Sequence, residues 1–251
     1  MKTIKQVQTI ILTGICFLFS LQASSQLVKN TTGGNQLKLV FENKVGGAKL
    51  VLGNGYTNPF GETYTIKKFR YYITQIQLLD SSDMSVQFFP NDYFLVDAGD
   101  SASATITVPL SVQHITSISF LLGVDSTANV SGVQDGALDP ANGMFWTWNT
   151  GYIMAKFEGI SAVAKVPGNA FSFDVGGFKK GENAARKIEM LTKTSKNKVI
   201  NTIVINVDVN KWFNGVHSIN IAGHPLCHEP GALAIQFADN YATMFSIQQM
   251  K

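Results

Sequence analysis

The residues most able to do chemistry lie in one ten-residue stretch, 143–152, which reads GMFWTWNTGY. It holds two of the three tryptophans of the chain, Trp146 and Trp148, separated by one residue. On a strand, residues two apart project from the same face, about 7 Å apart at a rise of roughly 3.3 Å per residue. Such a pair suits either packing in a sandwich core or the loss of electrons to an oxidant, because indole is readily oxidised.

The run before these aromatics, 132–142, is rich in Gly, Asp, Asn and Pro. Residues of these types form turns, so we expect the tryptophans to be delivered from a turn, with at least one ring near the surface. The oxygen-bearing side chains of this region could also bind calcium, but they lack the spacing of an EF-hand. We therefore interpret them as turn residues: Asp125, Asn129, Asp135, Asp139 and Asn142.

A second group of reactive residues lies near the C-terminus, in the sequence HPLCHEP. His224, Cys227 and His228 place two imidazoles and a thiol within five residues, which suits a soft transition metal. The spacing is neither that of a zinc finger nor that of haem attachment. The alternative is a polar loop around a buried cysteine. No oxyanion loop or acidic partner stands out for a Cys–His catalytic pair, so we do not expect an enzyme.

Alternation of apolar and polar residues predicts strands along most of the chain. We expect them at 36–41, 64–79, 93–96, 104–108, 115–122, 152–157, 171–175, 187–191 and 199–207. Helical spacing appears after Pro230 and continues to about Asn240. The predicted fold class is all-β, an antiparallel β-sandwich with a short C-terminal helix.

Residues 1–25 have the pattern of an export signal, with lysines 2 and 5, an apolar core at 10–21 and a small-residue end. The apolar core is short for a transmembrane segment and no second one follows, so we expect one domain, 26–251, that is periplasmic or secreted. Loss of the two lysines lowers the formal net charge from +3 to +1, which argues against a nucleic-acid partner. Of two cysteines only Cys227 remains, so no internal disulfide can form.

Three segments make the chain resemble a known family: 71–76 (YYITQI), 132–159 (GVQDGALDPANGMFWTWNTGYIMAKFEG) and 239–246 (DNYATMFS). They are similar to the MbnP-like family of exported bacterial proteins, and the resemblance extends from about residue 37 to residue 247. It implies a β-rich, copper-binding protein that works beside a MauG-like di-haem cytochrome c peroxidase. In some members that peroxidase oxidises a tryptophan to kynurenine, which helps to bind the metal.

The resemblance assigns site residues unevenly. The Met-Phe-Trp-x-Trp core of the family matches at Met144, Trp146 and Trp148, so either indole could be the modified one. Many relatives have a histidine before the Gly-Gly turn, where this chain has Asp174, and that difference would move the copper site toward Cys227 and His228. The predicted metal ligands are Met144, Asp174, His224, Cys227 and His228.

Three hypotheses follow. The first is a copper-binding accessory protein of the bacterial envelope, with a peroxidase partner and no turnover of its own. The second is a β-sandwich module that binds a glycan or a protein with Trp146 and Trp148 as a stacking platform. The third is an exported domain with a purely structural role.

Overall fold

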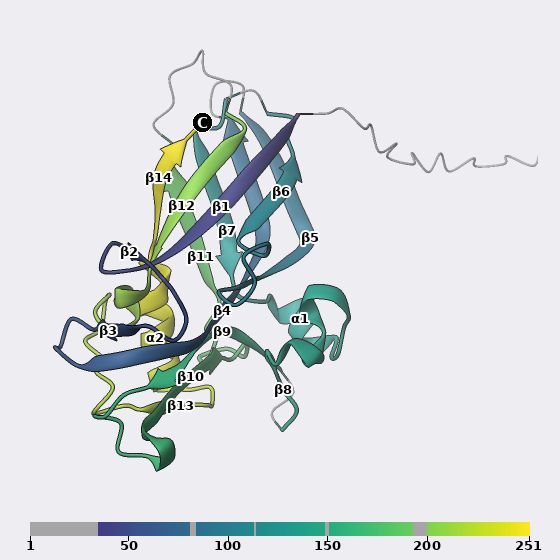
Figure 1. Ribbon diagram of the computed structural model, residues 1–251. Helices are drawn as coiled ribbons and strands as arrows, with labels where there is room; N and C mark the ends of the chain where they lie inside the picture. Colours follow the sequence, from purple (N-terminus) through teal and green to yellow (C-terminus); the bar gives the residue numbers. More distant parts are fainter. Residues whose placement is uncertain (1–34, 81–83, 113, 149–150, 193–199) are drawn as a thin grey trace, which may run out of the picture. The chain divides into compact units, whose positions relative to one another are not determined.

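The computed structural model describes residues 35–80, 84–112, 114–148, 151–192 and 200–251 (Figure 1). These residues belong to one unit of the chain, Gly34–Lys251. The predicted export signal at 1–25 lies outside the described residues. Within them, no helix is long and apolar enough to cross a membrane.

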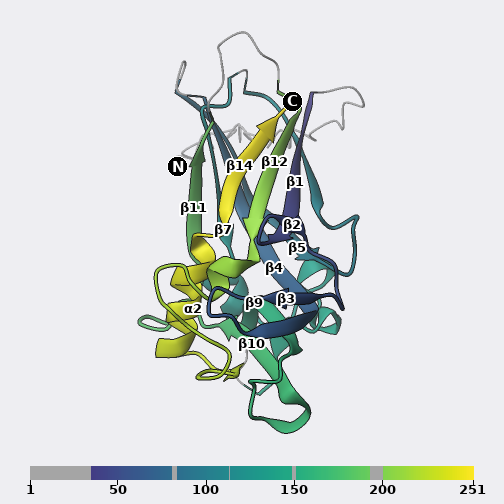
Figure 2. The same cartoon turned by 60° about the vertical axis from the view of Figure 1, so that its left-hand side comes forward.

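The first sheet contains the N-terminal strand of the unit and its last strand. Its order is β14 (Phe245–Met250), β12 (Thr202–Asp208), β1 (Gln36–Val45) and β2 (Ala48–Lys49), and β6 (Thr105–Pro109) also pairs with β1. Figure 2 shows β14, β12 and β1 side by side. On β1 the side chains of Leu37, Leu39 and Phe41 are buried and alternate with more exposed ones, because successive side chains point to opposite faces of a strand.

The second sheet is organised around one long strand, β4 (Thr63–Asp80). Its order is β11 (Arg186–Leu191), β7 (Ser117–Leu122), β4, β9 (Gly151–Ile160), β10 (Ala170–Gly176) and β13 (Leu226–Cys227). Three further strands lie off this path: β3 (Gly55–Thr57) and β5 (Ser85–Asp97) pair with β4, and β8 (Phe145–Trp146) pairs with β9.

β4 changes neighbours at an irregularity in its middle. Residues 65–71 pair with β9 and residues 73–79 pair with β7, with a shift of register between Thr74 and Gln77. Gln75, between them, has a φ of 51°. An extra residue of this kind bends a strand and increases its twist. The bend lets one strand serve both the β9–β10 part of the sheet, which carries the candidate site, and the β7–β11 part.

The described residues form two α-helices, α1 (Ser126–Val130) and α2 (Ala232–Ala242). Short 3₁₀ turns lie at η1 (Gly136–Leu138), η2 (Pro140–Asn142), η3 (Pro167–Asn169) and η4 (Val209–Trp212). α2 begins where the sequence predicts a helix. It packs against β10, β11 and η4 (Figure 2), with the rings of Phe237 and Phe173 4.4 Å apart between centroids.

A shared core joins the two sheets. Phe41 of the first sheet contacts Tyr71 and Phe120 of the second, with ring centroids 6.2 and 5.8 Å apart. Farther along the core, Trp212 packs among Phe157, Phe173 and other aromatic rings. This core replaces the disulfide framework that the single cysteine of the unit rules out.

The mainly β fold confirms the predicted class, but the predicted antiparallel pairing is wrong for two pairs of strands. β1 runs parallel to β12, and β10 runs parallel to β13. Parallel neighbours need a long crossover connection, which here spans most of the unit for β1 and residues 177–225 for β10. Side chains alternate in both kinds of strand, so the sequence pattern could not distinguish them.

Candidate functional site

The tryptophan stretch forms a short hairpin between β8 and β9. Phe145 pairs with Tyr152 and Trp146 with Gly151. Arg70 of β4 anchors the segment that precedes the hairpin, because its Nη1 donates to the carbonyl of Asn142 at 2.7 Å. The Asp/Asn-rich run therefore delivers the aromatics from a turn, as the sequence predicts.

Two acidic residues of the region 125–142, Asp125 and Asp139, cap the starts of helices. Asp125 caps α1, where its Oδ1 accepts a hydrogen bond from the Ala128 amide at 3.1 Å. Asp139 caps η2 in the same way, through the amide of Ala141 at 2.8 Å. These contacts are the ordinary use of Asp at helix starts and agree with the interpretation as turn residues.

The two indoles touch, but they do not share a strand. Trp146 lies on β8 and is 5% exposed, whereas Trp148 lies in the turn beyond and is 64% exposed. Their ring centroids are 5.5 Å apart and the ring planes are tilted by 41°. The predicted common strand is wrong because β8 ends at Trp146 to begin the turn. The predicted surface position of one ring agrees with the structure, and the contact between the two rings is a further observation. With one ring buried and the planes tilted, the pair does not form a flat two-ring platform.

Burial of Trp146 depends on a glycine of the Gly-Gly pair that ends β10. A Cβ on Gly176 would lie 2.8 Å from Cζ3 of the Trp146 ring and 2.7 Å from the carbonyl oxygen of Tyr152. Real Cβ atoms do not approach so closely, so only glycine lets the indole rest on the backbone of β10. The next residue, Gly177, has a φ of 123°, a conformation that other residues rarely adopt.

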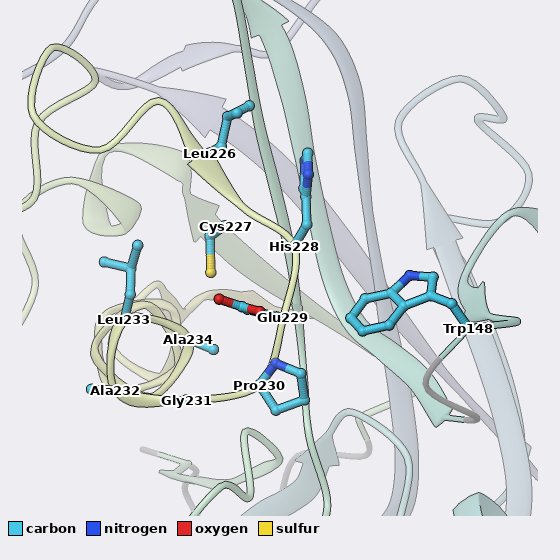
Figure 3. Close-up of a pocket in the computed structure, with 10 residues that line it drawn as sticks. All are labelled: Trp148, Leu226, Cys227, His228, Glu229, Pro230, Gly231, Ala232, Leu233 and Ala234. Carbon is cyan, nitrogen blue, oxygen red and sulfur yellow. The ribbon is translucent and has the colours of Figure 1, made fainter.

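Trp148 lines a pocket of about 410 Å³ together with the C-terminal Cys-His segment (Figure 3). The other lining residues are Leu226, Cys227, His228, Glu229, Pro230, Gly231, Ala232, Leu233 and Ala234. The two chemical candidates of the sequence, the tryptophan pair and the Cys-His segment, thus meet at one place. The sequence did not predict this proximity, because the two segments lie far apart in the chain.

Cys227 and His228 point to opposite sides of this segment. Cys227 pairs with Phe173 of β10 and is buried, and Figure 3 shows its Sγ directed toward the start of α2 while the imidazole of His228 points away. Burial, with the nearby charges of Asp174 and Glu229, raises the pKa of the Cys227 thiol to about 12. The thiol is therefore protonated at neutral pH. Its burial agrees with the alternative to a metal ligand, a polar loop around a buried cysteine.

Asp174 is the neighbour of His228 across the parallel pair. Each follows directly on a paired residue, Asp174 on Phe173 of β10 and His228 on Cys227 of β13. Burial is the largest influence on the pKa of Asp174, and Lys156 and, least of all, His228 oppose it. Burial outweighs these opposing effects, so the pKa of Asp174 is raised overall. One carboxylate oxygen, Oδ2, accepts from Nζ of Lys156 at 3.0 Å. The other, Oδ1, is buried and has no hydrogen-bond partner among the described residues.

Lys156 is a functional candidate that the sequence analysis missed. Its Nζ lies between Asp174 and Glu158, at 3.0 and 3.1 Å, and the residue is 8% exposed. Lys68 binds the far side of Glu158 at 3.2 Å. A lysine flanked by apolar residues in the strand sequence IMAKF was the available signal, since lysine is rarely buried without a partner.

Two predicted ligands lie apart from the pocket. His224 is exposed on a turn that precedes β13, and Met144 is fully buried in the hydrophobic core. The turn is anchored by Glu62, whose carboxylate accepts from the amides of Ile221 and Ala222 at 2.8 and 2.9 Å. Glu62 was not singled out in the sequence, because an isolated Glu next to a Gly carries no recognisable pattern.

No group of three or more His, Cys, Asp or Glu side chains lies close enough to hold a metal ion within the described ranges. The three-residue ligand set His224, Cys227 and His228 is therefore not assembled, and copper binding by this chain stays a prediction. The register of β10 and β13 places Asp174 next to His228 along the parallel pair, and His228 lines the pocket with Trp148.

Comparison with known proteins agrees with this fold. A solved structure, MbnP from Methylosinus trichosporium, aligns with 85% of this chain and 98% of its own length, with a TM-score of 0.57 and 14% sequence identity. At that identity the likeness concerns the fold alone. No curated protein gives a significant match. Residues 34–229, most of the chain, match the family described as MbnP. The hairpin, the Gly-Gly pair and the Cys-His segment lie within that match, and the chain belongs to the MbnP family.

Proposed function

We propose that this protein is an exported copper-binding accessory protein of the bacterial envelope, periplasmic or secreted, with no catalytic turnover of its own. The two sheets form the halves of a sandwich that holds a metal-binding residue pair next to an oxidisable indole. A di-haem peroxidase-like partner removes electrons from that indole. Family membership supports this function, and the resemblance of the tryptophan stretch to copper-associated relatives points the same way.

One observation carries the proposal: Trp148 and His228, far apart in the sequence, line the same pocket. His228 supplies an exposed imidazole, and Asp174 supplies a buried carboxylate oxygen that lacks a hydrogen-bond partner. An unpaired buried carboxylate oxygen is costly, and a cation would remove that cost. The residues present thus fit a metal ion with nitrogen and oxygen donors, a set that suits Cu(II).

Residues that line the pocket and residues that lie outside its lining have separate roles in this proposal. The imidazole of His228 and Oδ1 of Asp174 bind the metal, while Lys156 holds the other oxygen of Asp174 in place. Trp148 is exposed to a partner and contacts Trp146, so that charge can pass between the two rings. Cys227 contributes to the core in this proposal, because its thiol is buried and directed away from the His228 imidazole. Copper, when bound, supplies one-electron chemistry beside the indole.

Copper titration of two single-histidine variants tests this assignment. His228→Ala should weaken Cu(II) binding by more than the roughly 10–100-fold that loss of an outer-shell partner costs, because a direct ligand is removed. His224→Ala is the matched control, since that exposed side chain lies outside the pocket and its loss should leave affinity unchanged. Isothermal titration calorimetry would measure the Cu(II) affinity of each variant, and circular dichroism would show that each is folded. Normal affinity in His228→Ala, or loss of binding in His224→Ala alone, would refute the assignment.

A further inference from the structure

Three tyrosines, Tyr72, Tyr93 and Tyr152, lie in or near the tryptophan hairpin, and their hydroxyl groups have different hydrogen-bond partners. Tyr152 contacts Phe145 of the hairpin at 5.0 Å between ring centroids and Tyr72 at 6.1 Å. The hydroxyl of Tyr152 donates to the carbonyl of Leu138 at 3.0 Å, and that of Tyr72 donates to the carbonyl of Ala137 at 3.1 Å. Backbone carbonyls accept a hydrogen bond but do not take up a proton at neutral pH.

Tyr93 of β5 differs because its hydroxyl donates to a carboxylate. The distance from its Oη to Oδ2 of Asp125 is 2.6 Å, which is short for a hydrogen bond between oxygens. Asp125 is held in place by its other oxygen, which caps α1 through the amide of Ala128. Among the three tyrosines, Tyr93 alone has a positioned base that could accept its proton.

The surroundings of Tyr93 connect it to the hairpin and to solvent. Burial raises the pKa of Tyr93, the hydrogen bond to Asp125 raises it further, and Tyr152 adds the smallest effect. The side chain of Asn129 on α1 connects Asp125 to Tyr152. Its Nδ2 donates to the carbonyl of Asp125 and its Oδ1 accepts from the amide of Tyr152, each at 2.9 Å. Tyr93 also lines a pocket of about 560 Å³ beside α1 and η1.

We propose that Tyr93 is a redox-active tyrosine that receives oxidising equivalents arriving through the hairpin. The phenol gives one electron to a one-electron oxidant, a high-valent haem or a photochemical Ru(III) complex, and its proton moves to Oδ2 of Asp125. The products are a neutral tyrosyl radical, a neutral Asp125 carboxyl group and an oxidant reduced by one electron. The hydroxyls of Tyr72 and Tyr152 donate to backbone carbonyls, so neither phenol has a base that could accept its proton on oxidation. Oxidation therefore stops at Tyr93. The native oxidant and the route through the hairpin rest on the proposed function, whereas the pairing of Tyr93 with Asp125 does not.

Flash-quench oxidation of the purified full chain by tris(bipyridine)ruthenium(III), followed by electron paramagnetic resonance, tests this proposal. The wild type should give a tyrosyl signal that disappears in Tyr93→Phe and persists in Tyr72→Phe. Asp125→Asn should slow formation of the radical by about 10²-fold, the lower end of what a positioned base contributes. Asn caps a helix as well as Asp does, so circular dichroism should show this variant folded.

A tyrosyl signal that survives in Tyr93→Phe, or a rate in Asp125→Asn equal to that of the wild type, would overturn the assignment. Because the oxidant is photochemical and no copper is added, the outcome does not depend on copper binding. A protein that fails to bind copper but forms the Tyr93 radical would refute the proposed function and support this inference. A protein that binds copper through His228 and forms no Tyr93 radical would do the reverse.

Discussion

Protein isolated from its native host should carry one oxidised tryptophan, at position 148, and an intact indole at position 146. Conversion to kynurenine removes one carbon and adds one oxygen, so the ring must be reached by an oxygen-containing reactant and must release a product. Trp148 is 64% exposed and lines the pocket, whereas Trp146 is buried against Gly176 and Trp212 is buried in the core. Access therefore selects Trp148.

Tandem mass spectrometry of the tryptic fragment that ends at Lys156 would locate the change. Fragment ions that break the backbone between positions 146 and 148 separate the two indoles. Trp148→Phe made in the same host should show no modification at Trp146. Wild-type protein made without a peroxidase partner should keep both indoles. Oxidation at Trp146 with Trp148 intact, or two unmodified indoles in native material, would contradict the assignment of Trp148.

Gly159→Ala should produce the largest loss of stability among single substitutions where β9 lies between β4 and β10. A Cβ at this position would lie 2.0 Å from the backbone carbonyl oxygen of Thr65 and 2.5 Å from the ring of Phe171. Backbone on one side and a fully packed aromatic core on the other leave no room to relax. We expect the free energy of unfolding to fall by about 3 kcal/mol or more, the upper range for overpacking.

Equilibrium unfolding in urea would measure this loss, with Gly55→Ala as the matched control. Gly55 lies on β3 of the same sheet, and an added Cβ there meets nothing within 4 Å. Its replacement should change stability by no more than roughly 0.5 kcal/mol, as for most surface sites. Equal stability of the two variants would show that the strands around position 159 can separate without cost.

The strands were predictable because their alternation is strong and local. The sequence of β4 alternates for most of its length, and helical spacing located α2 to within two residues of its observed end. Parallel pairing was not predictable, since it depends on where distant segments meet. The turn that moves Trp148 off the strand was also missed, because TWNT after Trp146 contains no Gly or Pro to mark it.

The sequence singled out some residues of the candidate site but not their arrangement. His228 and Cys227 were identified from their types, yet their opposite directions follow from β13, a strand of two residues that no periodicity can reveal. Asp174 was singled out by resemblance, whereas its contact with Lys156 required the register between β9 and β10. Tyr93 and Asp125 lie on separate elements, and only the fold makes them a pair.

The central claim is that copper binds between Asp174 and His228 beside Trp148. Crystals of copper-loaded protein, measured at the copper absorption edge, would locate the metal by anomalous diffraction without reference to any variant. We expect one strong peak in the Trp148 pocket, within bonding distance of the His228 imidazole and Oδ1 of Asp174. A peak at Cys227 Sγ on the buried side, a peak at His217 where that imidazole meets Asp239, or no peak at all would contradict the claim.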